Sequence, residues 1–382
     1  MVIYSTIFLA IFQAFVQVRP PAFDAQVVDG RISIGYGLAI GDVDGDRKPD
    51  ILLADQKQFV WYRNGDWKRF VMVENLTEYD NVCLAARDID GDGKVEVAVG
   101  GQWNPSETSD TTKSGAVYYL RRPKDPTGLW TPVKLHHEPT VHRMRWIQIA
   151  ADRFTLLVVP LHGRGNKNGA GKGVRVLAYT PPARMGDNWN YAVVDTSMHM
   201  THNFDVVAVT EDPKAANAKA ESVLLGGREG IRELYYDGKT WRSVRRLADE
   251  RGFGEVRASA LGVAGISPMH GNQVVMHSGT GKTVLTSEIS QGHALAAANV
   301  IGDERPEIIV GWREPDRDQK TGIKIFVVGQ APNDVSWKEY WLDENQIACE
   351  DLVVADLNAD GKPDIVAAGR ATHNLKIYWN RN

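Results

Sequence analysis

Acidic residues at a fixed spacing are the first feature of this sequence that could do chemistry. Three short segments carry oxygen-bearing side chains at positions one, three, five and nine. Side chains at this spacing in one tight loop converge on a point, and calcium prefers such oxygen ligands. We therefore expect up to three structural calcium sites; the alternative is acidic turns without metal. The expected ligands are Asp42, Asp44, Asp46 and Asp50; Asp88, Asp90, Asp92 and Glu96; and Asp356, Asn358, Asp360 and Asp364.

A fourth segment keeps the spacing but loses one ligand. It carries Asn299, Ile301, Asp303 and Glu307, so isoleucine replaces an oxygen donor. We expect this loop to bind calcium poorly or not at all.

The acidic segments also define a repeat. GDVDGDRKPDILLAD, RDIDGDGKVEVAVGG and ADLNADGKPDIVAAG, which begin at Gly41, Arg87 and Ala355, superimpose without gaps and each predict a strand, a tight turn and a strand. A second marker alternates with them, because a strand-like stretch opens at Trp67, Trp130, Trp189, Trp241 and Trp337. Repeated units of four antiparallel strands are typical of a β-propeller.

Counting the inner strands predicts an all-β, seven-bladed propeller spanning residues 21–382. These strands are expected to begin near Gly35, Asn81, His142, His202, Val256, His293 and Glu350. The stretch LKIYWN near the C-terminus lacks a following fourth strand, while FDAQVVD near Phe23 has no blade before it. Pairing of these N- and C-terminal strands would close the ring and remove exposed sheet edges.

The repeats resemble the FG-GAP or VCBS family of integrin-type and bacterial extracellular propellers. The acidic motif occurs in about four of the seven expected blades. The resemblance implies the propeller fold and bound calcium, but it does not imply an activity.

Aligning the blades brings histidines from distant parts of the chain to one end of the axial channel. The residues at the starts of inner strands include Tyr36, His142, His202, His293 and Glu350. Three imidazoles with an open fourth position are typical of catalytic zinc, and other divalent transition metals also suit them. We expect His142, His202 and His293 to share such an ion. The alternative is that each is an ordinary hydrogen-bonded residue of the channel.

The loops between second and third strands share this face of the disc. They contribute further candidates with imidazole, guanidinium or indole groups, namely Trp103, His162, Arg228, His270, Trp312, Arg313 and Arg370. Arg143 lies beside the axial set. Guanidinium and indole groups suit a polyhydroxylated ligand, with indole rings stacking on sugar faces; packing between blades is the alternative.

At these residues the sequence is similar to the propeller domain of the aldos-2-ulose dehydratase family. The similar stretches are HRMRW, VVPLHGRGN, MTHNF, MHGNQVV, QGHALAAANV and ACEDLVVADLNADGKPDIVAAGRATHNLKIYW. The resemblance implies a metal-containing cleft and lyase chemistry on keto-sugars.

The resulting hypothesis is a metal-dependent carbohydrate lyase or dehydratase, a carbon–oxygen lyase that acts by β-elimination. The metal would polarise the carbonyl, and the candidate bases are Glu350, His162 and His270. Arg143 or Arg228 would bind a sugar oxygen or the leaving group. Tyr36, Trp103, Trp312, Arg313 and Arg370 would contact substrate. The alternative is a non-catalytic, calcium-stabilised extracellular propeller that binds glycans or a protein partner.

Composition limits the remaining possibilities. A net charge of −4 and a pI near 6.2 disfavour nucleic acid as a partner.

The apolar stretch within residues 1–20 is short for a membrane span and predicts a signal peptide, hence a secreted or periplasmic protein. Cys83 and Cys349 are the only cysteines. They fall in blades that are not neighbours, so buried free thiols are favoured over a disulfide bridge.

Overall fold

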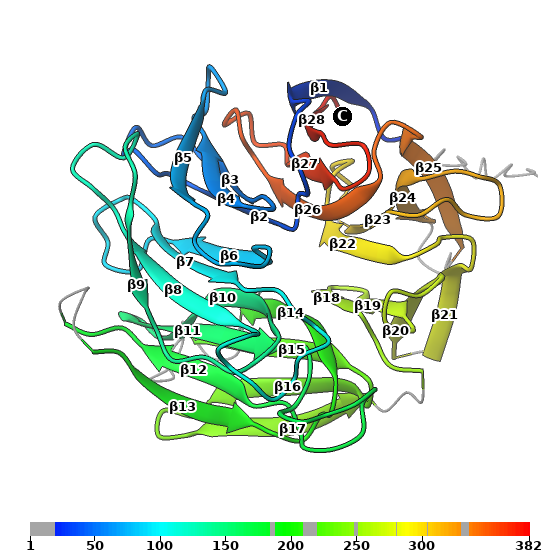
Figure 1. Cartoon of the computed structure of the whole chain (residues 1–382). Helices are drawn as coiled ribbons and strands as arrows, with labels where there is room; N and C mark the ends of the chain where they lie inside the picture. The colour runs from blue at the N-terminus through cyan, green and yellow to red at the C-terminus, as the bar shows by residue number, and fades with distance from the viewer. Residues whose placement is uncertain are drawn as a thin grey trace, which may run out of the picture.

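The chain folds into seven sheets of four antiparallel strands arranged around a common centre (Figure 1). The computed structural model describes residues 20–183, 188–208, 220–247, 251–279, 281–303, 305–329 and 336–382. The predicted signal peptide lies outside the described residues except for Pro20. No helix long and apolar enough to cross a bilayer occurs in the described part of the chain.

The seven-bladed propeller predicted from the sequence is confirmed. Blade 1 comprises β2 to β5, with bounds Gly37–Gly41, Asp50–Ala54, Gln58–Tyr62 and Arg69–Glu74. Blade 2 comprises β6 to β9, with bounds Cys83–Arg87, Glu96–Gly101, Ala116–Arg121 and Thr131–Lys134. Blade 3 comprises β10 to β13, with bounds Val141–Ala150, Arg153–Pro160, Val176–Thr180 and Asn190–Asp195. Blade 4 comprises β14 to β17, with bounds Thr201–Ala208, Glu221–Gly227, Gly230–Tyr236 and Trp241–Leu247. Blade 5 comprises β18 to β21, with bounds Glu255–Ser259, Gly262–Ser267, Gln273–Ser278 and Gly281–Thr286. Blade 6 comprises β22 to β25, with bounds Gly292–Ala298, Glu307–Trp312, Gly322–Val328 and Trp337–Glu344.

Blade 7 is built from both ends of the described chain. It contains β26, β27 and β28 (Cys349–Ala355, Asp364–Gly369 and Leu375–Asn380) together with β1 (Phe23–Asp29). β1 pairs antiparallel with β28 from Phe23 opposite Asn380 onwards, and the two lie side by side in Figure 1. The Trp379 indole also donates to Gln26 Oε1 at 2.8 Å. The predicted closure of the ring is confirmed.

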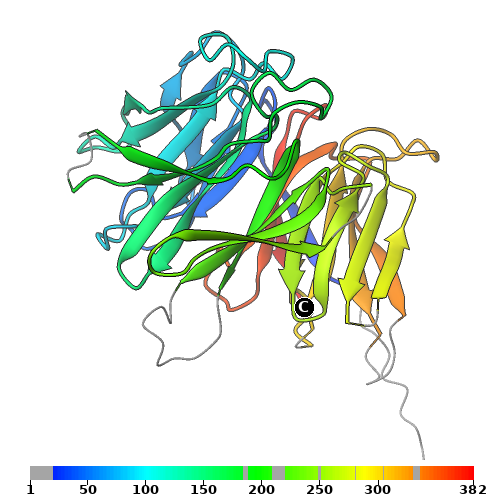
Figure 2. The same ribbon diagram turned by 90° about the horizontal axis from the view of Figure 1, so that it is seen from below.

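Burial explains why the strands of a blade differ in composition. The second strands β3, β7, β23 and β27 are buried along their whole length, because each blade is covered by a neighbour on both faces. Hence they read as continuous apolar runs. The outer strands β13 and β17 are mostly exposed and carry more polar residues. Figure 2 shows the same sheets from below.

Each inner strand packs against the inner strand of the next blade, and β26 packs against β2 to complete the circle. Cys83 in β6 and Cys349 in β26 are buried free thiols. Burial raises the pKa of the Cys83 thiol to about 12, so this thiol stays protonated and unreactive.

Candidate metal centre

Four inner strands are irregular at the same place, the second residue from their start. In β10, β14, β22 and β26 the pairing with the next strand shifts register around His142, His202, His293 and Glu350. The inner strands of blades 1, 2 and 5 pair with their neighbours without such a shift. A β-bulge leaves a residue unpaired and redirects its side chain. The bulges therefore coincide with the four ionisable residues that the sequence places at the axis.

The three axial histidines share one hydrogen-bonding pattern. Nδ1 of His142 contacts the carbonyl oxygen of His202 at 2.9 Å, Nδ1 of His202 contacts that of Gly254 at 2.9 Å, and Nδ1 of His293 contacts that of Glu350 at 2.6 Å. Each contact joins one blade to the next. A carbonyl oxygen can only accept, so Nδ1 carries the hydrogen in all three rings. When the ring is neutral, Nε2 is therefore left as the electron-pair donor.

The rings gather into one cluster. His202, His270 and His293 each offer a ring nitrogen within 4.8 Å of the others, and Nε2 of His202 lies 2.6 Å from Nε2 of His270. The ring of His142 is adjacent, 4.5 Å from that of His202 between centroids. His270, predicted as a base, thus joins the predicted ligands. It occupies the left-handed region at φ 50°, a conformation that a non-glycine residue rarely adopts.

Burial keeps three of these imidazoles, those of His142, His270 and His293, neutral. Desolvation, with help from neighbouring positive charge, lowers the pKa of His142 and of His293 well below the usual range. The same cause lowers the pKa of His270 to about 2. Neutral imidazole is the form that binds metals.

Glu255, which the sequence analysis missed, supports His202 from behind. Both side chains are fully buried, and Oε1 of Glu255 lies 3.3 Å from Nδ1 of His202. Burial alone would raise the pKa of Glu255, but the hydrogen bond from His202 and the charge of Arg257 lower it to about 2. A carboxylate or carbonyl behind the ring typically orients a metal-binding histidine. The available signal was an acidic residue at the start of the inner strand of blade 5, next to the expected strand start at Val256.

This donor set fits the divalent transition metal that the sequence predicts. Main-chain carbonyls orient the rings of His202 and His293, burial keeps His270 and His293 neutral, and several imidazole nitrogens converge from different blades. Zinc accepts three such ligands and keeps a fourth position open. Occupancy by a metal stays a prediction.

A cavity of about 110 Å³ adjoins the cluster. Apart from Val82, its wall is formed by residues that the sequence singled out, namely Tyr36, Trp103, His142, Arg143, His270, His293, Arg313, Glu350 and Arg370. The structure therefore brings together side chains from blades 1, 2, 3, 5, 6 and 7.

Glu350 is held by two arginines. Nη1 of Arg313 lies 3.0 Å from both carboxylate oxygens, and Nη1 of Arg370 lies 3.0 Å from Oε1. Oε1 is also 4.0 Å from Nε2 of His293. The guanidinium of Arg370 stacks over the Tyr36 ring at 5.4 Å. These contacts fix the one carboxylate among the residues that line the cavity.

Four predicted site residues do not line this cavity: His202, which belongs to the adjoining histidine cluster, and Trp312, His162 and Arg228. Trp312 is fully buried, packs against Trp341 and donates Nε1 to the Lys320 carbonyl. Without exposed surface it cannot stack on a sugar, so it is a packing residue of blade 6. His162 pairs with Met200 between blades 3 and 4, and Arg228 is exposed and donates to the Asn168 carbonyl. The expected contact of Trp312, His162 and Arg228 with the axial site is corrected accordingly.

The acidic loops lie at the opposite ends of the inner strands. Asp42, Asp44 and Asp50 bring one carboxylate oxygen each within 4.8 Å of one another, as do Asp88, Asp90 and Glu96. Their main-chain bonds repeat: Gly45 N donates to Asp42 and Gly91 N donates to Asp88, both at 2.7 Å. In the third loop Gly361 N donates to Asp356 at 2.8 Å. Calcium in these loops stays a prediction.

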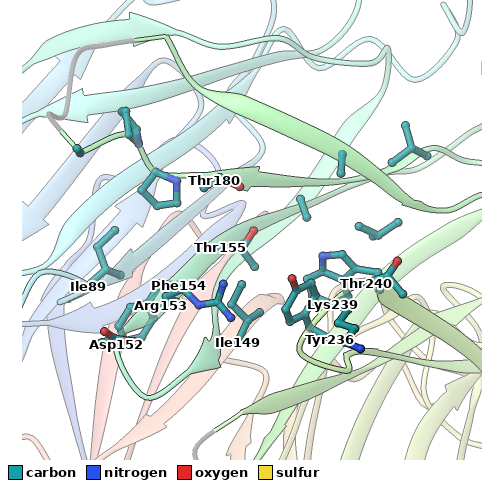
Figure 3. A pocket seen from close by; sticks show the side chains of 18 of the residues that line it. Ile89, Ile149, Asp152, Arg153, Phe154, Thr155, Thr180, Tyr236, Lys239 and Thr240 are labelled. Atoms are coloured by element: carbon teal, nitrogen blue, oxygen red, sulfur yellow. The ribbon is translucent and has the colours of Figure 1, made fainter. Parts of the chain in front are cut away.

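A larger groove of about 660 Å³ lies on the side of the acidic loops (Figure 3). It is lined by Asp90, by Arg153 and Phe154 next to the first turn of blade 3, and by Tyr236 and Trp241 of blade 4. None of the predicted axial residues lines it. The chemistry that the sequence predicts is thus concentrated in the smaller central cavity.

Comparisons with known proteins agree with this fold. Residues 42–99 match the FG-GAP-like repeat, and residues 114–278 match the model described as "Aldos-2-ulose dehydratase, beta-propeller domain". The chain is thus a seven-bladed propeller with FG-GAP-type repeats.

More particularly, it resembles the propeller domain of aldos-2-ulose dehydratase. The enzyme of that name from Phanerodontia chrysosporium is 22% identical over 330 residues, which cover 77% of this chain and 36% of the relative. The match therefore spans about a third of the length of this curated relative.

Solved structures support the fold alone. BBS1N in complex with ARL6DN matches with 15% identity and a TM-score of 0.57, covering 96% of this chain and 98% of that chain. Sqt1 of Saccharomyces cerevisiae matches with 10% identity and a TM-score of 0.53, covering 92% and 97%.

Proposed function

We propose that this protein is a metal-dependent carbohydrate lyase that performs β-elimination on a keto-sugar or keto-glycoside in the central cavity. The observation that carries the proposal is the convergence of ring nitrogens of His202, His270 and His293 within 4.8 Å. A propeller that only binds a partner needs no such convergence of imidazoles from three blades. The similarity to the propeller domain of aldos-2-ulose dehydratase supports a carbohydrate-related role.

The proposed ion is zinc or another divalent transition metal. It would be held by His202, His270 and His293, with His142 beside them. When bound, such an ion polarises a carbonyl and stabilises negative charge on its oxygen.

The chain's own residues would move the proton. The carboxylate of Glu350 would remove a proton from the carbon atom next to the carbonyl group. A carbon–carbon double bond forms as the bond to the β-oxygen breaks. The same carboxyl group would then return the proton to the departing oxygen, which leaves as water or an alcohol. Arg313 and Arg370 orient this carboxylate.

Calcium in up to three acidic loops would have a structural role, fixing the turns between first and second strands. We further propose that the protein is exported, with residues 1–20 acting as a signal peptide. N-terminal sequencing of the mature protein tests the export.

Metal analysis and turnover test the catalytic proposal. Purified protein should contain a transition metal besides calcium, and a His202→Gln, His293→Gln double variant should lose it. A 3-keto-glycoside should give enone absorbance with metal-loaded protein. Glu350→Gln should keep the metal and lose turnover. His199→Gln is the control, because this histidine is exposed and pairs with Glu229. Calcium alone in the wild-type protein, with no enone formed, would overturn the proposal in favour of a binding propeller.

A further inference from the structure

The four acidic loops lie in consecutive blades of the ring. They belong to blades 6, 7, 1 and 2, and the packing of β26 against β2 makes blades 7 and 1 neighbours. In each loop the carboxylate at position nine accepts a hydrogen bond from the main-chain nitrogen at position two, as Asp50 does from Val43 at 2.8 Å. Glu307 accepts the same bond from Val300 at 2.7 Å. The loop of blade 6 therefore keeps this geometry, although it has lost a ligand.

The loops of blades 1 and 2 are joined by a main-chain hydrogen bond. The nitrogen of Val95 donates to the carbonyl oxygen of Asp42 at 2.8 Å. Asp42 is the first expected ligand of blade 1, and Val95 directly precedes Glu96, the last expected ligand of blade 2. The stem of Lys94 also covers Gly45 in the first loop, where a Cβ atom would lie 2.5 Å from Lys94 Cε. Each loop therefore restrains the other.

Proline rules out this bond in two other loops. Pro49 and Pro363 stand at the position of Val95 in blades 1 and 7, and proline has no N–H to donate. An asparagine that ends or follows the third strand of the blade supplies the donor instead. It is Asn64 in blade 1 and Asn380 in blade 7.

These asparagines connect neighbouring loops. Nδ2 of Asn64 donates to the carbonyl oxygen of Leu357 in the blade 7 loop at 2.8 Å, and the main-chain nitrogen of Asn64 donates to Asp50 Oδ1 at 2.8 Å. Asn380 repeats both bonds, with the carbonyl of Val300 in the blade 6 loop and with the last expected ligand of its own loop, each at 2.9 Å. The links thus form one series from blade 6 to blade 2.

This series has a consequence for ion binding. The loops of blades 1 and 2 each bring three carboxylate oxygens within 4.8 Å of one another, an arrangement that suits a hard cation. An ion that fixes one loop also fixes the carbonyl group on which the next loop depends. Ordering the second loop then costs less conformational entropy, and binding to the two sites becomes cooperative.

We propose that the acidic loops of blades 7, 1 and 2 bind calcium with positive cooperativity, transmitted by Asn64 and by the bond from Val95 to Asp42. This inference rests on the structural calcium sites proposed above and is independent of the lyase. Asn64 is a positioning residue, because its side chain bonds main-chain carbonyls and is not an expected ligand. The blade 6 loop takes part only as a support for Asn380.

Removing one site while measuring the others is the primary test. Asp88→Asn changes an expected ligand of blade 2, and we expect the calcium affinity of the remaining sites to fall at least about fivefold. Isothermal titration calorimetry measures this change. The wild-type binding curve should have a Hill coefficient above 1. Unchanged or tighter binding by the remaining sites, or a wild-type Hill coefficient of 1, would overturn the inference.

A double-mutant cycle locates the coupling. Val95→Pro removes the N–H by introducing the residue that blades 1 and 7 already carry, whereas Val95→Ile keeps the N–H. A lysine precedes this position in all three loops, so the backbone before the new proline is matched. Adding Asp88→Asn should weaken the remaining sites less than about twofold in Val95→Pro and about fivefold in Val95→Ile. Equal losses in both would contradict the role of this bond.

Asn64→Ala should uncouple blade 7 from blade 1 and lower the Hill coefficient towards 1. Asn190→Ala, at an exposed position of β13, is the control and should leave it unchanged. A Hill coefficient that Asn64→Ala does not alter would contradict its role. If a variant does not fold, the comparison of wild-type protein with Asp88→Asn still decides.

The coupling and the calcium sites can fail separately. Calcium ions that bind independently of one another would retain the structural sites and reject the coupling. A wild-type protein that binds no calcium would reject the sites and the coupling together.

Discussion

His142 donates its Nδ1 hydrogen to the main-chain carbonyl of His202, 2.9 Å away, so one candidate metal-binding side chain is oriented by the backbone of another. The same relationship joins His202 to Gly254 and His293 to Glu350. Each bond links the bulge of one inner strand to the inner strand of the following blade. The packing of neighbouring blades therefore sets the direction of each imidazole, without help from a flexible loop.

Acidification should destabilise the metal-free protein through the buried His142, His270 and His293. Their pKa values are lowered by burial in the folded state, whereas histidine in an unfolded chain titrates near ~6.5. Below that pH the unfolded state binds more protons, so stability is present above it and is lost as the pH falls. Urea unfolding at pH 7.5 and pH 5 should show the loss, up to about 1.4 kcal/mol per pH unit for each histidine.

The variant His293→Gln should reduce this pH dependence. A wild-type free energy of unfolding that does not vary between pH 7.5 and pH 5 would show that these rings are not held neutral.

Calcium should raise the melting temperature, because an ion that binds only the folded state stabilises it by mass action. Chelation with EGTA should lower the midpoint of thermal unfolding by several degrees, measured by circular dichroism. Asp88→Asn should remove about one bound calcium per chain. Asp303→Asn, in the loop where Ile301 replaces a ligand, should leave the stoichiometry unchanged. A midpoint of thermal unfolding that does not change with EGTA would indicate that the loops are acidic turns without bound calcium.

Calcium affinity should also depend on pH. Burial raises the pKa of Asp50 and of Glu96 to about 7. Each carboxyl must lose its proton to bind the ion, so affinity should fall as the pH drops through about 7. Titrations with calcium at pH 8 and pH 6 measure the difference. Tighter binding at pH 6 would contradict the assignment of these residues as ligands.

Removing Lys376 should be costly. Its ammonium is 2% exposed and pairs with Asp343, which also accepts the Tyr378 hydroxyl at 2.7 Å. Lys376→Met leaves a buried carboxylate without its counter-charge, which typically costs roughly 3–5 kcal/mol. Lys113→Met breaks an exposed pair with Asp110 and should cost no more than about 1 kcal/mol. Urea unfolding measures the free energy of unfolding of both variants. Similar decreases in the two variants would show that the buried Lys376–Asp343 pair is no more important than an exposed one.

Deleting residues 1–29 should open the ring. Without β1, the edge of β28 loses its partners and is exposed to pairing with other chains. We expect a lower melting temperature and self-association by light scattering. A synthetic peptide of residues 20–31 should restore the monomer. A truncated protein that stays monomeric with an unchanged midpoint would show that closure contributes little.

The fold could be predicted because one or the other of two sequence markers recurs in six of the seven blades. The acidic turn before Asp50 and Glu96 and the tryptophans before β5, β9 and β13 marked strand boundaries that the structure confirms. Blade 5 lacks both markers, yet the apolar alternation from Val256 onwards was sufficient to count it.

The site could be predicted only in part. The rotational symmetry of the blades predicted that His142, His202, His293 and Glu350 lie at one level along the propeller axis. The residues around them gave no sign of the β-bulges that redirect their side chains. A bulge depends on how two strands pair, for instance on Val141 facing Pro160 while Arg143 faces Val159. The place of His270 depends on a loop conformation with positive φ. Trp312 was predicted to contact substrate, but it ends strand β23 and its ring is buried in the core, a side-chain direction that the repeat pattern does not reveal.

The shared construction of blade 7 has a consequence for biosynthesis. A ribosome makes β1 before any other strand described here and β28 after all of them, yet the two must pair. Glu350 and Arg370 also emerge late, long after His142 and His202. The nascent protein can therefore stack its early blades while it is still being translated, but the wall of the central cavity is completed only when β28 pairs with β1.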